Sequence, residues 1–107
     1  MTRIIRSSDR AYRGIGLPGI EKAVLWRGGQ GVIYEFFKLA KGVDYPEHTH
    51  DGWESMFVLD GRIRLSGEVM GPGDFVFTEP GETHIAEILE DSVVLLGFGK
   101  DYEPEPA

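Results

Sequence analysis

Residues 42–61, GVDYPEHTHDGWESMFVLDG, carry the clearest structural signal in the chain. They hold two of the three histidines in the chain, His48 and His50, followed four residues later by Glu54. Two residues apart on an extended chain, the histidines point to the same face. Glu54 can rejoin that face after the short loop formed by residues 51–53. The stretch therefore predicts that two imidazoles and one carboxylate converge.

The second half of this stretch predicts a β-hairpin. Asp60-Gly61 is the dipeptide that a two-residue type I′ turn prefers, and such a turn would pair residues 56–59 with residues 62–65. Alternation along the two strands gives an apolar face made of Met56, Val58, Ile63 and Leu65. The opposite face is mixed and carries Phe57, Leu59, Arg62 and Arg64. Glu54 has the parity of the apolar face, where a carboxylate is costly unless it is paired or binds a metal.

The third histidine, His84, follows a tight EPGE turn at residues 79–82. Two histidines by themselves would favour an exposed strand with an unrelated glutamate. Three histidines and an inward glutamate that converge from neighbouring strands instead form a nitrogen and oxygen site that suits a first-row divalent metal. We therefore predict one divalent transition metal per chain (Fe, Mn, Ni or Zn), and the sequence does not choose among these metals.

The rest of the chain has the pattern of short β-strands. Apolar runs rich in Val, Ile, Phe and Tyr alternate with glycine-, proline- and aspartate-bearing turns, which is typical of an all-β barrel or sandwich. The runs lie at residues 23–26, 32–40, 55–59, 62–65, 75–78, 84–89 and 92–98. We predict a single domain, with an N-terminal arm (1–20), a barrel (21–100) and an acidic C-terminal tail (101–107).

Composition narrows the possible partners. The 107 residues include 11 Lys and Arg against 18 Asp and Glu, which gives a formal net charge of −7. This charge disfavours nucleic acid and anionic membranes as partners. The chain has no cysteine, so thiolate metal sites are excluded. The N-terminal residues lack the apolar segment of a signal peptide, and we expect a cytoplasmic protein.

Residues 42–61 resemble the first motif of the cupin family, G-x5-H-x-H-x3-E-x6-G, at every defined position: Gly42, His48, His50, Glu54 and Gly61. Residues 73–84 resemble the second motif through Gly73, Gly81 and His84, although Glu79 stands where the family usually has proline. The resemblance implies a double-stranded β-helix, the jelly-roll barrel of cupins. It also implies a metal held by His48, His50, Glu54 and His84, and a homodimer, for which the mixed face with Phe57 and Leu59 is suited.

Two functions are compatible with such a site. In the first, the protein is a metal-dependent enzyme, a dioxygenase-type oxidoreductase or less readily an isomerase or lyase, acting on a small organic molecule. Met56, Val58, Ile63 and Leu65 would then line its pocket, and Tyr45, Trp53 and Glu79 would support the ligands. The segment TEPGETH (78–84) is similar to that of small cupins that cleave hydroxyacetophenones or β-diketones. In the second, four ligands close the coordination of a zinc ion in a non-catalytic or ligand-sensing module, similar to the cupin domain of zinc-binding anti-sigma factors.

Overall fold

The computed structural model describes residues 1–44, 48–49, 51–100 and 102. Apart from a short 3-10 turn, η1 (Ser7–Asp9), its regular elements are all β-strands. They are β1 (Arg13–Gly14), β2 (Ile20–Arg27), β3 (Ile33–Leu39), β4 (His48–Thr49), β5 (Trp53–Asp60), β6 (Ile63–Leu65), β7 (Glu68–Met70), β8 (Phe75–Thr78), β9 (Thr83–His84), β10 (Ala86–Ile88) and β11 (Ser92–Gly99). Every predicted apolar run overlaps a strand, which confirms the all-β class. In the part of the chain that is described, no helix is long and apolar enough to cross a membrane.

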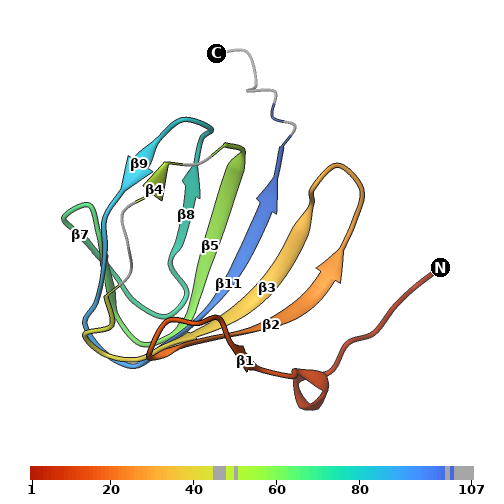
Figure 1. Cartoon of the computed structure of the whole chain (residues 1–107), viewed down its shortest axis with the longest axis horizontal. Helices are drawn as coiled ribbons and strands as arrows, with labels where there is room; N and C mark the ends of the chain where they lie inside the picture. The colour runs from red at the N-terminus through yellow and green to blue at the C-terminus, as the bar shows by residue number, and fades with distance from the viewer. Residues whose placement is uncertain (45–47, 50, 101, 103–107) are drawn as a thin grey trace.

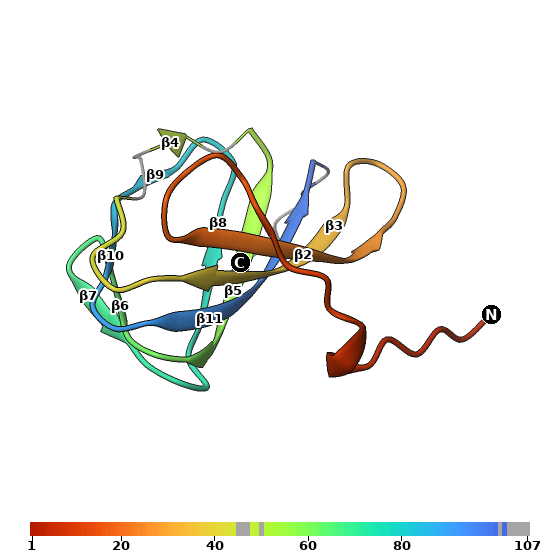
Figure 2. The ribbon, with the colours of Figure 1, turned by 60° about the horizontal axis from the view of Figure 1, so that its bottom comes forward.

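The strands form one large sheet and two small ones (Figures 1 and 2). The large antiparallel sheet has the order β1-β2-β3-β11-β5-β8, and the small sheets have the orders β10-β6-β7 and β4-β9. The hydrophobic core takes side chains such as Phe37, Val58 and Val94 from the large sheet. It takes Ile63 and Ile88 from the three-stranded sheet. The sheets therefore pack face to face as the two walls of a jelly-roll barrel.

The predicted hairpin between residues 56–59 and 62–65 is wrong. Strand β5 pairs with β11 and β8, whereas β6 pairs with β10 and β7, so the chain changes sheet at Gly61. Gly61 has a φ of +94°, but Asp60 is not among the described residues with positive φ, so a type I′ turn does not form. The predicted alternation nevertheless holds: Met56, Val58, Ile63 and Leu65 are all buried. They reach the same core from opposite walls.

The N-terminal arm contacts the outer face of the large sheet. The guanidinium of Arg10 lies 3.6 Å from the ring centroid of Phe36, and the Lys38 ammonium lies 4.1 Å from that of Tyr12. Arg13–Gly14 then pairs with β2, which begins at the buried Ile20. The residues before η1 extend away from the barrel in both views (Figures 1 and 2).

Candidate metal centre and the cavity beside it

Glu54 is a buried carboxylate at the start of β5. Its side chain is only 6% exposed, and its cross-strand partners are Thr78 on β8 and Phe98 on β11. The inward direction agrees with the parity that the sequence predicted. Burial raises the pKa of Glu54 to about 7, because the low-dielectric interior penalises the charged form. In the metal-free protein, this carboxyl group therefore gains or loses its proton near neutral pH.

His84 reaches the same region from β9, on the opposite wall. Its backbone pairs with that of His48 in the β4-β9 ladder, so the backbone of two positions that are 36 residues apart lies side by side. The Nδ1 atom of His84 lies 3.5 Å from the hydroxyl oxygen of Thr78. The side chain of His48 and all of His50 and Tyr45 lie outside what the structure describes. Their roles as ligands and as a supporting residue remain predictions.

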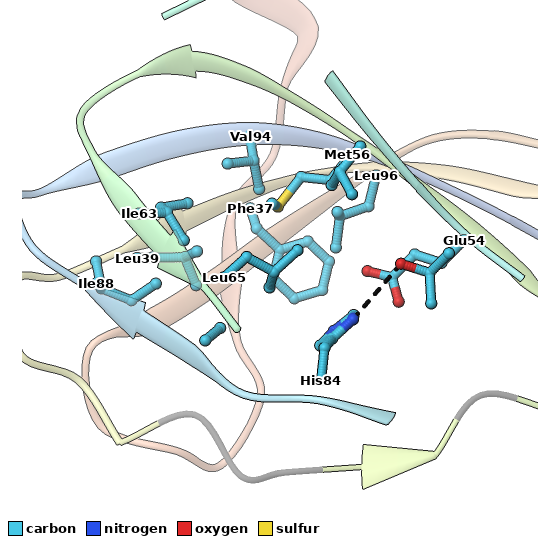
Figure 3. Close-up of a pocket in the computed structure, with 13 residues that line it drawn as sticks. Phe37, Leu39, Glu54, Met56, Ile63, Leu65, His84, Ile88, Val94 and Leu96 are labelled. Carbon is cyan, nitrogen blue, oxygen red and sulfur yellow. Dashed lines mark hydrogen bonds between the residues drawn. The ribbon is translucent and has the colours of Figure 1, made fainter. Parts of the chain in front are cut away.

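Glu54 and His84 line one end of an apolar cavity between the walls (Figure 3). In this view Leu39, Ile63 and Ile88 lie at the opposite end. The complete lining is Phe37, Leu39, Glu54, Met56, Ile63, Leu65, Val76, Thr78, His84, Ala86, Ile88, Val94 and Leu96. The volume open to the centre of a water molecule is ≈ 30 Å³. This is room for about two water molecules, since one needs roughly 10–15 Å³ by the same measure.

The described residues fit a divalent metal. A buried carboxylate with a raised pKa favours a nearby cation, and an imidazole on the same cavity wall supplies a nitrogen ligand. Among the side chains that the structure describes, no three metal-binding groups cluster. Glu54 and His84 would supply half of the predicted ligand set, and His48 and His50 the other half.

The remaining predicted site residues lie in different places. Met56, Ile63 and Leu65 line the cavity, whereas Val58 is fully buried in the adjoining core. Trp53 and Glu79 are not among the lining residues; both belong to the outer surface at the same end of the sheet.

Several lining residues were not predicted from the sequence, among them Phe37, Thr78 and Leu96. Alternation in residues 33–39 and 92–99 divides each strand into two faces. Which of the two faces points inward depends on pairing with distant strands.

Comparison with known proteins places the chain by both sequence and structure. The family model of the ChrR cupin-like domain matches residues 2–101. A chain in the crystal structure of Rhodobacter sphaeroides SigE in complex with the anti-sigma ChrR is 27% identical, with a TM-score of 0.75. The match covers 87% of the present chain but only 50% of that one, so this chain spans half of its length.

Two further solved structures match this chain over nearly the whole of their own length. A predicted oxalate decarboxylase from Thermotoga maritima is 25% identical, with a TM-score of 0.75 over 90% of this chain and 97% of that one. KdgF from Halomonas sp. is 21% identical, with a TM-score of 0.80 over 96% and 97%, and shows the fold alone. No curated protein matches the sequence.

Proposed function

We propose that this chain, which belongs to the family of ChrR cupin-like domains, is a metal-dependent enzyme, a dioxygenase-type oxidoreductase acting on a small organic molecule. One observation carries the proposal: two proposed metal ligands, Glu54 and His84, line the same cavity as ten apolar side chains. A structural zinc site needs no chamber beside it, whereas a catalytic site needs room for substrate at the metal.

The chain supplies binding, orientation and a dry environment. The proposed ligands are His48, His50, Glu54 and His84, and the metal would act as a Lewis acid that polarises substrate oxygens and positions O2. The apolar walls exclude water and favour substrates with little charge. Because the free volume is small, a substrate larger than about two water molecules would require side chains to move. Met56, which is unbranched and flexible, is the lining residue best suited to do so.

Metal content of untagged protein tests the proposal. Cells are grown with iron, manganese, nickel and zinc all available, and each metal is quantified per chain by mass spectrometry. We expect close to one equivalent in the wild type and in Arg64→Ala, and a large loss in His50→Ala and Glu54→Gln. Arg64 is a suitable control because it does not line the cavity. Its guanidinium instead forms an ion pair with the Glu87 carboxylate, with a nitrogen–oxygen distance of 3.1 Å. Full metal content in all variants would contradict the ligand assignment.

Oxygen uptake then tests the enzymatic part. Protein loaded with iron or manganese should consume O2 in the presence of small β-diketones or phenolic ketones, and Glu54→Gln should not. A rate of O2 uptake equal to that of the same metal without protein would contradict oxygenase activity.

The second candidate is a non-catalytic module that senses or binds a ligand through zinc. It is favoured by the 27% identity to a chain of the SigE–ChrR complex. One zinc per chain that resists chelation, with all ligand positions taken by protein atoms, would support this function and exclude the first. Zinc that exchanges readily for iron would leave the enzymatic function in place.

We also propose that the protein forms a homodimer through the outer face of the large sheet. Phe57 and Phe75 are cross-strand partners there and are 37% and 60% exposed, and Leu59 is also exposed. Contiguous exposed apolar surface commonly marks an interface. Analytical ultracentrifugation should give a dimer for the wild type and a monomer for Phe57→Ser with Phe75→Ser. A wild-type monomer at all concentrations would contradict the dimer.

A further inference from the structure

A row of three aromatic rings lies on the outer surface of the large sheet, behind the proposed metal centre. The rings belong to Trp53, Phe77 and Tyr102, and we call this group the aromatic clamp. The rings of Trp53 and Phe77 are stacked with centroids 6.0 Å apart and planes 20° apart. Tyr102 continues the row, with its centroid 5.5 Å from that of Phe77. The clamp therefore joins β5, β8 and the segment that follows β11.

The sheet fixes the position of the first ring. Trp53 pairs across strands with Gly99, and a Cβ atom at Gly99 would overlap the indole ring of Trp53. Only glycine leaves room for the indole against the backbone of β11. Trp53 is thus held between this backbone on one side and the ring of Phe77 on the other.

The last ring is tied to the turn that leads to His84. The hydroxyl group of Tyr102 donates a hydrogen bond to Oε1 of Glu79 at 3.0 Å. Glu79 begins this turn, since its carbonyl oxygen accepts a hydrogen bond from the amide of Glu82 at 3.2 Å. Tyr102 is thereby bonded to the first residue of the turn that leads to His84.

Each clamp residue on the sheet is adjacent to a residue of the site. Trp53 precedes Glu54, and Phe77 precedes Thr78, whose hydroxyl oxygen lies 3.5 Å from Nδ1 of His84. Alternation sends the rings outward and the polar groups inward from the same strand ends. A shift of these strand ends would therefore move both Glu54 and Thr78, the residue that contacts His84.

We infer that the aromatic clamp, with the bond between Tyr102 and Glu79, is a positioning device that restrains Glu54 and His84 for metal binding. This inference rests on the proposed metal site and adds residues that touch neither the metal nor the cavity. Because positioning and binding are thermodynamically coupled, metal should in turn tighten the clamp.

Zn²⁺ affinity, measured by competition with a chromophoric chelator, tests the inference. Tyr102→Phe keeps the ring and removes only the hydroxyl group, so we expect affinity to fall about three- to tenfold, the range for one hydrogen bond. Glu79→Leu, which removes the acceptor of this hydrogen bond, should weaken binding to a similar degree. The double variant should be no weaker than the stronger-acting single variant, since both changes remove the same bond. Gly99→Ala, which displaces Trp53, should weaken binding further.

The control is Val69→Ala. Val69 lies on β7, outside the large sheet; it is exposed and belongs neither to the clamp nor to the cavity lining. The affinity of this variant for Zn²⁺ should stay within twofold of that of the wild type. Equal affinity in the wild type, Tyr102→Phe and Gly99→Ala, together with loss of binding in Glu54→Gln, would overturn the clamp and keep the metal site.

Hydrogen exchange separates failure of the clamp from failure of the metal site. In metal-free protein, Tyr102→Phe should speed amide exchange in residues 79–84 and leave residues 33–39 unchanged. If the wild type binds no Zn²⁺, the metal site fails, and faster exchange in residues 79–84 alone would retain the clamp as a restraint on this turn. Unchanged exchange would overturn the clamp whether or not the metal binds.

Discussion

At the scale of single residues, Glu54 determines what the cavity can do. It is a carboxylate 6% exposed, and its neighbours on the cavity wall include Met56 and Leu96. Its raised pKa means that protons and metal ions compete for the same oxygen atoms. The residue thus couples the stability of the metal-free protein and its affinity for metal to pH, in opposite directions.

We predict that the metal-free protein becomes less stable as pH rises through neutrality. The pKa of Glu54 is 4.5 in the unfolded chain and about 7 in the fold, so between these values the native state holds a proton that the unfolded state has lost. The free energy of unfolding should therefore fall by about 3 kcal/mol between pH 4.5 and a pH above 7, at 1.36 kcal/mol per pKa unit.

Urea denaturation in EDTA between pH 4.5 and 8.5 measures this loss. Glu54→Gln, which cannot titrate, is the reference that removes the contribution of all other groups. The same pH slope in both proteins would show that Glu54 does not carry the effect. Affinity for Zn²⁺ should rise over the same range, as the carboxylate loses its proton.

At the scale of elements, the switch between β5 and β6 at Gly61 forms the barrel. The backbone there has a φ of +94°, and a Cβ atom would lie 2.5 Å from the carbonyl oxygen of Asp91 and 2.6 Å from Cα of Ser92. The crossing is therefore packed directly against the start of β11. Only glycine satisfies both the conformation and the contact.

We predict that Gly61→Ala destabilises the fold more than Gly73→Ala. Gly73 has nearly the same φ, +90°, but a Cβ atom there would meet nothing within 4 Å. Both variants incur the cost of a left-handed conformation, roughly 1–2 kcal/mol. Gly61→Ala must in addition displace the backbone of Asp91 and Ser92, so we expect it to lose at least about 2 kcal/mol more. Chemical denaturation of the two variants compares these losses, and equal losses would show that the crossing tolerates the displacement.

At the scale of the whole molecule, the proposed site lies between separate sheets. Glu54 belongs to the large sheet and His84 to the two-stranded sheet β4-β9. A metal bound to both would cross-link the two walls of the barrel. The cross-link would restrain the small sheet, whose two strands have two residues each.

We predict that metal raises the melting temperature of this domain. At a free metal concentration 100 times the Kd, binding contributes about 2.7 kcal/mol, which corresponds to a shift of roughly 10 °C or more for a domain of this size. Differential scanning calorimetry with EDTA and with Zn²⁺ measures the shift. Glu54→Gln should show little of it, and an equal shift in this variant would mean that the metal binds elsewhere.

Sequence patterns alone were enough to predict the all-β class, to recognise the cupin motif and to predict the inward direction of Glu54. Strand alternation and ligand spacing are local properties, readable from residues 48–58 without knowledge of their partners. The burial of Met56, Val58, Ile63 and Leu65 followed from the same alternation, even though the predicted hairpin between their strands was wrong.

Only the tertiary structure decided the pairing of β5 with β11 and β8, the contact between Thr78 and His84, and the clamp behind them. Each of these joins strands from different parts of the chain. The local alternation of residues predicts which residues share a face of a strand. It does not predict which strands lie beside it or in what register they pair. Those are chosen by the packing of all strands around one core, which residue spacing does not encode.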